Sequence, residues 1–256
     1  KAERLSQLDF PKDLRYRFYQ TKGSWLITTW QLREAEDAYF KAIALSSAMA
    51  DSSKMVASHS GLASTLAGQN RYHEAIRHQK LALNYFGSLD SLRYYSLLSN
   101  LAVSYNQAQL FDKSLEYYLK VKRFFKESGE YGKQAIVENN IGELYRERLN
   151  DLDRAQKQYH QAISLNQKVN NKSHLVQNYH NLGLVHRELQ QYDSAFYYAR
   201  KSLSLRKEIG SEGGLAIAMH ALGDLFVDNG QLDSALWAFN ETLSISQKMG
   251  IPPGIY

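Results

Sequence analysis

Apolar residues recur along the chain with the spacing of amphipathic helices. At about 100° per residue, four side chains near position 183 fall on one helix face: Tyr179, Leu182, Gly183 and His186. Equivalent sets surround positions 102 and 142. The three prolines lie at 11, 252 and 253, so about 240 residues between them contain no obligate helix breaker. The pattern predicts an all-α chain.

A small residue returns on this face about every forty positions. The set consists of Gly23, Ala63, Ala102, Gly142, Gly183 and Gly223. A second small residue follows each one after 12 or 13 positions, in the set Ala35, Ala75, Ser114, Ala155, Ala195 and Ala235. Such pairs allow two helices to approach closely. The period predicts six helix-turn-helix units, over residues 12–50, 51–89, 90–129, 130–170, 171–210 and 211–250.

This arrangement resembles the tetratricopeptide repeat, in which a leucine–glycine pair on a first helix meets an alanine on a second. The nominal period of that family is about 34 residues, so the chain is most similar to its long-repeat subclass of about 40 residues. The resemblance implies a right-handed α-solenoid, and we expect one array over residues 1–256. Residues 251–256 are the start of a further repeat or a tail, and Lys1 in place of methionine indicates a piece of a longer protein.

Turn and helix-start residues also repeat. Left-handed turn positions are predicted between paired helices at Asn70, Gln109, Asn150, Gln190 and Gly230. Capping carboxylates are predicted at the starts of second helices at Asp112, Asp153, Asp193 and Asp233.

Few residues of the chain form patterns typical of catalytic or metal sites. The chain has no cysteine, and its eight histidines lack the HExxH spacing of zinc enzymes. His180 and His220 occupy equivalent places in neighbouring repeats, so a metal shared between them is the alternative to a chain without one. We expect no enzyme activity, no cofactor and no metal.

Charge and hydropathy exclude two partner classes. The net charge of +5 is mild and forms no basic run, so direct nucleic-acid binding is not expected. No apolar run approaches the ~18 residues that span a bilayer. We expect a soluble segment, with a cytoplasmic location favoured over a periplasmic sensor.

Function is expected on the first helices, which the resemblance places along a concave groove. Positions −6, −2, +1 and +5 from each small residue point away from the core face. Three asparagines share the −2 position: Asn100, Asn140 and Asn181. Amides donate and accept, so this ladder is predicted to hold the backbone of an extended peptide, as groove asparagines do in the long-repeat subclass. The alternative is that the asparagines bond one another or water. Apolar groove positions are Val103, Ile136, Leu184 and Ile217.

The two ends of the groove differ in chemistry. Small residues predominate in the N-terminal part, where Gly61 and Gly68 are expected to leave room for bulky ligand groups. Carboxylates predominate in the C-terminal part, at Glu143, Glu147, Glu188, Asp224 and Asp228. This acidic stripe predicts a ligand with a basic segment. The alternative is a solvated face that Arg146 and Arg187 neutralise.

Two functions therefore follow from the sequence. The first is a noncatalytic protein- or peptide-binding module, as the sensory or scaffolding part of a larger signalling or regulatory protein. The alternative is a self-association module that forms a homodimer through its uncapped C-terminal end.

Overall fold

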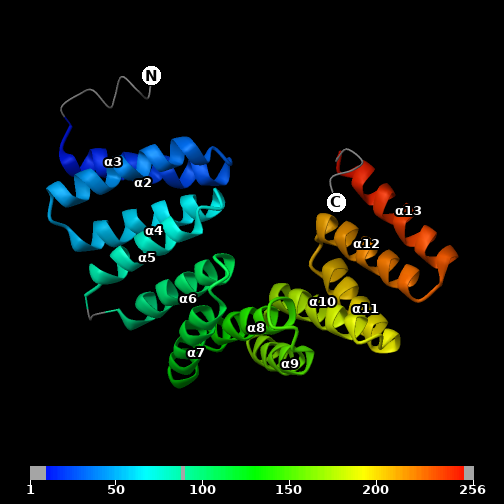
Figure 1. The fold of residues 1–256 in the computed structure, drawn as a ribbon. Coiled ribbons are helices and arrows are strands. Elements are labelled where there is room, and N and C mark those ends of the chain that lie inside the picture. The colour runs from blue at the N-terminus through cyan, green and yellow to red at the C-terminus, as the bar shows by residue number, and fades with distance from the viewer. Residues whose placement is uncertain (1–9, 88–89, 251–256) are drawn as a thin grey trace. The chain divides into compact units, whose positions relative to one another are not determined.

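The computed structural model describes residues 10–87 and 90–250, and within these ranges it contains helices and no strand. The helices are α2 (Lys12–Thr28), α3 (Leu32–Ala48), α4 (Ser52–Gly68), α5 (Tyr72–Asn84), α6 (Ser91–Gln107), α7 (Phe111–Glu127), α8 (Tyr131–Glu147), α9 (Leu152–Lys168), α10 (Lys172–Glu188), α11 (Tyr192–Glu208), α12 (Glu212–Asp228) and α13 (Leu232–Lys248) (Figure 1). They form the six predicted helix pairs, which confirms the all-α solenoid fold. The predicted further repeat or tail at 251–256 lies outside the described residues.

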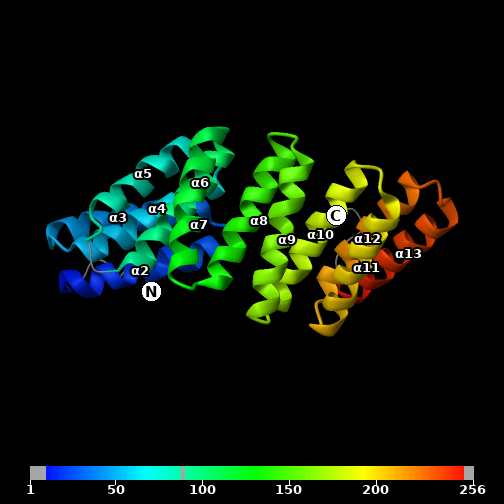
Figure 2. The ribbon, with the colours of Figure 1, turned by 90° about the horizontal axis from the view of Figure 1, so that it is seen from below.

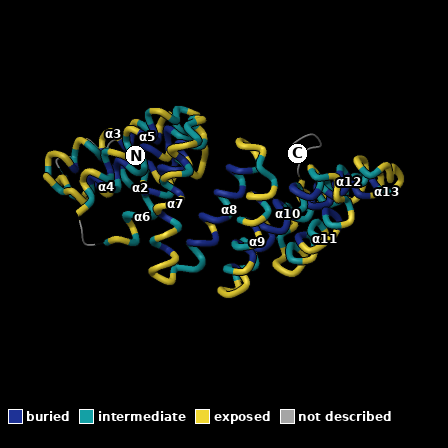
Figure 3. The backbone as a smooth tube through the Cα atoms, turned by 60° about the horizontal axis from the view of Figure 1, so that its bottom comes forward, coloured by how far each residue is buried: buried dark blue, intermediate teal, exposed yellow. Residues whose placement is uncertain are grey.

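The chain divides into two compact units, with the division inside α7 after residue 121. In unit 1 (residues 1–121), α2 pairs with α3 and α4 pairs with α5, while α3 packs on α4 and α5 on α6. In unit 2 (residues 122–256), the pairs are α8–α9, α10–α11 and α12–α13, joined through α9–α10 and α11–α12 packing (Figure 2). Buried positions follow the helix faces that meet, and exposed positions gather at turns and outer faces (Figure 3). One continuous array over both units stays a prediction.

Small residues on the first helices make room for an aromatic side chain of the paired helix. A Cβ added at Gly142 would lie 2.7 Å from the Tyr159 ring, and one at Gly223 would lie 2.5 Å from the Phe239 ring. Gly183 differs, because Ala199 stands where the Gly142 and Gly223 pairs have the aromatic residue and its backbone nitrogen is 3.7 Å away. The predicted core face is therefore correct, with one pair packed less tightly over its glycine.

In unit 1 one aromatic ring also fills space that the sequence assigned to a ligand. The Tyr39 ring lies 2.8 Å from a Cβ built at Gly23 and 2.2 Å from one built at Gly61. A Cβ at Gly68 would meet Leu32 at 3.2 Å. The expectation that these two glycines leave room for bulky ligand groups is wrong, because neighbouring core side chains occupy that room.

The turns explain why the helices end at regular intervals. Positive φ angles occur at all five predicted turn residues: Asn70 (60°), Gln109 (60°), Asn150 (49°), Gln190 (56°) and Gly230 (72°). At the α4–α5 turn, Arg71 N donates to Leu66 O at 2.9 Å and Asn70 N donates to Ala67 O at 3.0 Å, which is a Schellman closure.

The predicted aspartates lie at the starts of the second helices, but inside the first turn and not at the N-cap. Asp112, Asp153, Asp193 and Asp233 are in the first turns of α7, α9, α11 and α13, where they meet the positive end of the helix dipole. The residue that caps α9 is Asp151, whose side chain accepts a hydrogen bond from Arg154 N at 2.9 Å. None of the described helices is long and apolar enough to cross a bilayer.

Candidate functional site

The predicted groove positions of unit 2 lie on α8, α10 and α12, and we refer to the surface that carries them as the first-helix face. Ile136 and Ile217 are 40% and 54% exposed there, and Leu184 is half-buried. Asn140 lies one helical turn after Ile136 on α8 and is half-buried. In unit 1, α6 presents Asn100 and Val103, both exposed. The first-helix face therefore combines exposed branched aliphatic groups with amides.

The three predicted ladder asparagines are not equivalent. Asn181 is 3% exposed, and its Nδ2 donates to Asn139 Oδ1 at 3.0 Å and to Glu143 Oε1 at 3.3 Å. Its Oδ1 accepts from Gln177 Nε2 at 3.1 Å. Asn181 thus links α10 to α8 through residues outside the predicted ladder.

Asn181 belongs to a buried amide network between α8, α9 and α10. Asn178 and Asn166 are each 1% exposed. Asn178 Nδ2 donates to Asn139 Oδ1 at 2.9 Å, and Asn178 Oδ1 accepts from Asn166 Nδ2 at 2.7 Å. Asn139 Nδ2 in turn donates to Glu143 Oε1 at 3.0 Å. The sequence indicated none of Asn139, Asn166 and Asn178 as site residues.

The network has a fixed direction because it ends on a carboxylate. An ionised carboxylate only accepts hydrogen bonds, so Asn139 must turn its NH₂ group toward Glu143 and its oxygen toward Asn178 and Asn181. Asn178 then presents its own oxygen to Asn166. Burial raises the pKa of Glu143, and the hydrogen bonds from Asn139 and Asn181 oppose that shift.

The network borders a hollow of about 190 Å³ in the first-helix face. Its lining residues are Ala135, Ile136, Asn139, Asn140, Asn166, His174, Gln177 and Asn178. Asn166 Oδ1 is buried and accepts no hydrogen bond from any described residue. Two predicted groove residues, Ile136 and Asn140, thus line this hollow together with amides that the prediction missed.

Two of the missed residues, Asn166 and Asn178, differ from the residues at equivalent positions of a neighbouring repeat. Asn178 stands five positions before Gly183, and the equivalent residue before Gly142 is Val137. Asn166 stands eleven positions after Ala155, and the equivalent residue after Ser114 is Phe125, 2% exposed. Amides at positions that hold the buried apolar residues Phe125 in α7 and Val137 in α8 were the available signal.

Arginines neutralise most of the predicted acidic stripe. Arg146 pairs with Glu147 on α8 and with Glu188 on α10, the latter at 2.7 Å. Arg187 on α10 pairs with Asp228 on α12. These pairs follow the solvated-face alternative and tie neighbouring first helices together. Asp224 lies 3.5 Å from His220 Nδ1.

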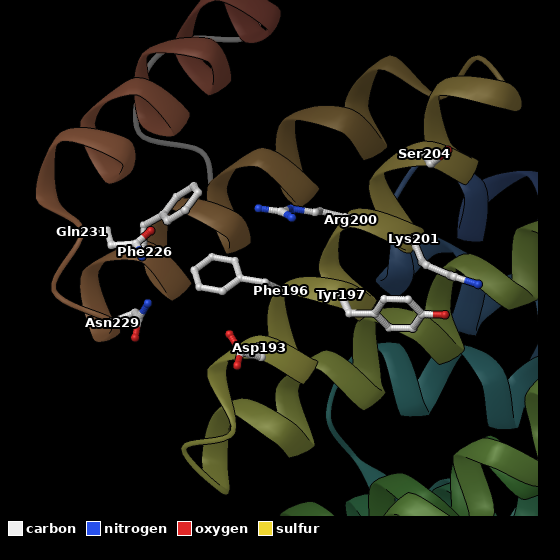
Figure 4. A pocket seen from close by; sticks show the side chains of 9 residues that line it. All are labelled: Asp193, Phe196, Tyr197, Arg200, Lys201, Ser204, Phe226, Asn229 and Gln231. Carbon is white, nitrogen blue, oxygen red and sulfur yellow. The ribbon is translucent and has the colours of Figure 1, made fainter.

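A second hollow, of about 510 Å³, opens beside α11 and the α12–α13 turn (Figure 4). Phe196 and Phe226 pack against each other in its wall, with ring centroids 4.9 Å apart. Arg200 lies over Phe196 at 5.9 Å, and Lys201 lies over Tyr197 at 5.1 Å. The remaining lining residues are Asp193, Ser204, Asn229 and Gln231. No predicted site residue lines this aromatic and basic hollow.

Comparisons with known proteins agree with the period read from the sequence. A family model described as Tetratricopeptide repeat matches residues 93–168 and 174–248. No curated protein sequence matches the chain. The solved structure of BtubC (BKLC) from P. vanneervenii is 20% identical, with a TM-score of 0.74, and the match covers 88% of this chain and 95% of that one.

Two further solved structures share the fold. A Rap protein complexed with Competence and Sporulation Factor is 15% identical, with a TM-score of 0.68 over 94% of this chain and 78% of that one. A signal transduction ATPase from Pyrococcus horikoshii, with a tetratricopeptide repeat sensor, is 11% identical, with a TM-score of 0.77 over 94% of this chain and 38% of that one.

Proposed function

The chain belongs to the tetratricopeptide repeat family, and on that premise we propose that it is a noncatalytic module that binds an extended protein or peptide segment on its first-helix face. The observation that carries this proposal is the exposure of Ile136 and Ile217 beside the amide-lined hollow. Exposed aliphatic groups that flank hydrogen-bonding amides suit a peptide, which offers both apolar side chains and backbone polar groups.

The similar structures support this assignment by their fold. The Rap protein was solved in complex with Competence and Sporulation Factor, and the Pyrococcus horikoshii repeats are described as a sensor. We propose the same kind of role here, as the sensory or scaffolding part of a larger signalling or regulatory protein. Within unit 1 taken by itself, we propose that Asn100 and Val103 on α6 form an equivalent pair of an amide and an aliphatic group.

A preference for a basic segment would rest on two of the predicted carboxylates. Glu143 and Asp224 form no ion pair with an arginine among the described residues, whereas Glu147, Glu188 and Asp228 do. Asn140 is the ladder residue of unit 2 whose amide we assign to the bound backbone. Each neutral hydrogen bond that it makes would contribute about 0.5–1.5 kcal/mol.

Selection from a displayed random peptide library tests the function. We expect the chain to enrich linear peptides, and Ile136→Lys with Ile217→Lys to abolish their binding while helix content is retained. Val169→Lys is the matched control, because Val169 is equally exposed (40%) but lies at the end of α9. Failure to enrich any peptide, or equal binding by the double variant, would overturn the proposal.

Self-association is the second candidate, and one observation favours it. Leu236 and Leu243 on α13 are 63% and 42% exposed, whereas the equivalent Phe196 on α11 and Ile163 on α9 are each 8% exposed. Light scattering should report a dimer that Leu236→Lys converts to monomer. A monomer at all concentrations would remove this candidate.

A further inference from the structure

The α9–α10 junction departs from the packing of the repeat array. The position of Asn166 is held by Phe125 in α7, and the position of Asn178 is held by Val137 in α8 and Ala218 in α12. Phe125, Val137 and Ala218 are 2%, 1% and 7% exposed, so apolar residues can fill both positions and leave no polar atom to satisfy. The Asn166 position varies more, with Arg206 in α11 and Ser246 in α13. The two amides therefore need an explanation other than packing.

The amide network delivers one unused acceptor to the hollow. Glu143 orients Asn139, Asn139 orients Asn178, and Asn178 takes the NH₂ group of Asn166. Asn166 can then turn only its oxygen toward the hollow. A buried acceptor without a donor costs about 1–3 kcal/mol, and a ligand that supplies the donor recovers that free energy.

The rest of the lining selects a neutral group that both donates and accepts. The lining contains no carboxylate, lysine or arginine, so a charged ligand group would be buried without a counter-charge. His174 Nδ1 lies 2.9 Å from Asn171 Nδ2, and Asn171 Oδ1 accepts from His174 N, which assigns Nδ1 as the acceptor. The neutral imidazole then carries its proton on Nε2 and offers a donor.

We propose that this hollow is a specificity pocket for a carboxamide side chain, glutamine or asparagine, of the bound segment. The NH₂ group would donate to Asn166 Oδ1, and the carbonyl oxygen would accept from Asn140 or His174. At about 190 Å³ the hollow is smaller than the pockets of about 300–1,000 Å³ that enclose whole ligands, and it suits one side chain. This proposal rests on the peptide-binding function.

Small probes test the pocket without any peptide. Chain labelled with ¹⁵N is titrated with propionamide, with butanone, which lacks the donor, and with propylammonium, which carries a charge. We expect saturable shifts of the Asn166 and Gln177 side-chain amide resonances with propionamide alone. Equal shifts with butanone would overturn the requirement for a donor, stronger shifts with propylammonium would overturn the neutral assignment, and no shift with any probe would overturn the pocket.

The control is a variant in which apolar side chains fill the hollow, which we call the plugged variant. The chain itself carries apolar residues at the equivalent positions of other repeats. Asn166→Phe with Asn178→Val copies the Phe125 and Val137 pair and should abolish the propionamide shift of the Gln177 side-chain amide, which this variant retains, while the protein stays folded. Asn140→Ala, at the half-buried rim, should weaken propionamide binding without disturbing the buried network. Retention of the shifts in both variants would overturn the pocket.

A positional peptide library separates this proposal from the function on which it rests. Wild-type chain should enrich glutamine or asparagine at one position by about tenfold or more, the scale of one recovered buried hydrogen bond. The plugged variant should still bind peptides but lose that preference. Binding without any preference in the wild type would overturn the pocket alone, and absence of binding would overturn the peptide-binding function.

Discussion

The α9–α10 and α11–α12 junctions place the second helix of one repeat on the first helix of the next, and they fill that contact with opposite chemistry. The α11–α12 junction buries Phe196 against Phe226 within an apolar cluster that includes Met219. The α9–α10 junction buries Asn166 against Asn178. Burial of apolar side chains stabilises the first junction. The amides of the second junction contribute little net stability, but their hydrogen bonds fix one another's orientation. On the proposed function, neighbouring junctions of unit 2 would divide cohesion from recognition.

Truncation at the apolar junction should have the largest effect. Phe196→Ala removes a ring that is 8% exposed and is expected to lower the free energy of unfolding by about 3 kcal/mol or more. Urea unfolding followed by circular dichroism measures the loss. Tyr197→Ala, with its ring 53% exposed, is the control and should change stability by about 0.5 kcal/mol or less. Equal effects would show that this junction does not supply cohesion.

Conversion of the polar junction to an apolar one should have an intermediate effect that depends on both partners. Asn178→Val leaves Asn166 Nδ2 without its acceptor and should cost about 1–3 kcal/mol. Adding Asn166→Phe removes the orphaned amide, so the double variant should regain most of that loss. A double-mutant cycle in urea measures the coupling. Additive losses would mean that the two asparagines stabilise the junction independently.

The carboxylate that orients the network should give the polar junction a pH dependence. Burial raises the pKa of Glu143, so the folded state holds the proton more tightly than the unfolded state. Its contribution to stability is present below about pH 4.3 and is lost as pH rises through the folded pKa. The unfolding temperature of wild type, measured relative to that of Glu143→Gln, should therefore be higher at pH 4 than at pH 7. A constant difference between the two proteins would contradict this.

The ion pair that links α10 to α12 should contribute least. Arg187 and Asp228 are each about one third exposed in their side chains, and such pairs contribute about 0–1 kcal/mol. Asp228→Asn is expected to lower stability by less than about 1 kcal/mol, and high salt should erase the difference. A larger or salt-independent loss would show that this pair belongs to the cohesive part of the array.

The fold could be predicted from the sequence because the same pattern of paired small residues occurs six times. Gly142 and Gly223 mark close helix contacts, and the aromatic residue that covers each one follows the second small residue of its pair by four positions. Turn residues such as Asn150 report where the helix must stop. Each of these signals is local, so helical periodicity is enough to place it.

The site was less readable, because periodicity gives the direction of a side chain and not what a neighbouring helix brings to meet it. Asn140 and Asn181 share one offset, yet Asn139 and Glu143 from α8 enclose only Asn181. Tyr39 closes the space over Gly61 in the same way. Contacts between helices of different repeats decide both cases, and no offset within one helix contains that information.

The shared turn geometry has a consequence for how such a protein changes over generations. Each of the four helices α8, α9, α10 and α11 is 17 residues long. The turns after α8 and α10 both contain a residue with positive φ, Asn150 and Gln190. A pair of substitutions at the Asn166 and Asn178 positions can therefore move a polar junction from one repeat to another with the backbone conserved. If the pocket binds as proposed, ligand preference would drift one junction at a time within unit 2, while the remaining junctions preserve foldability.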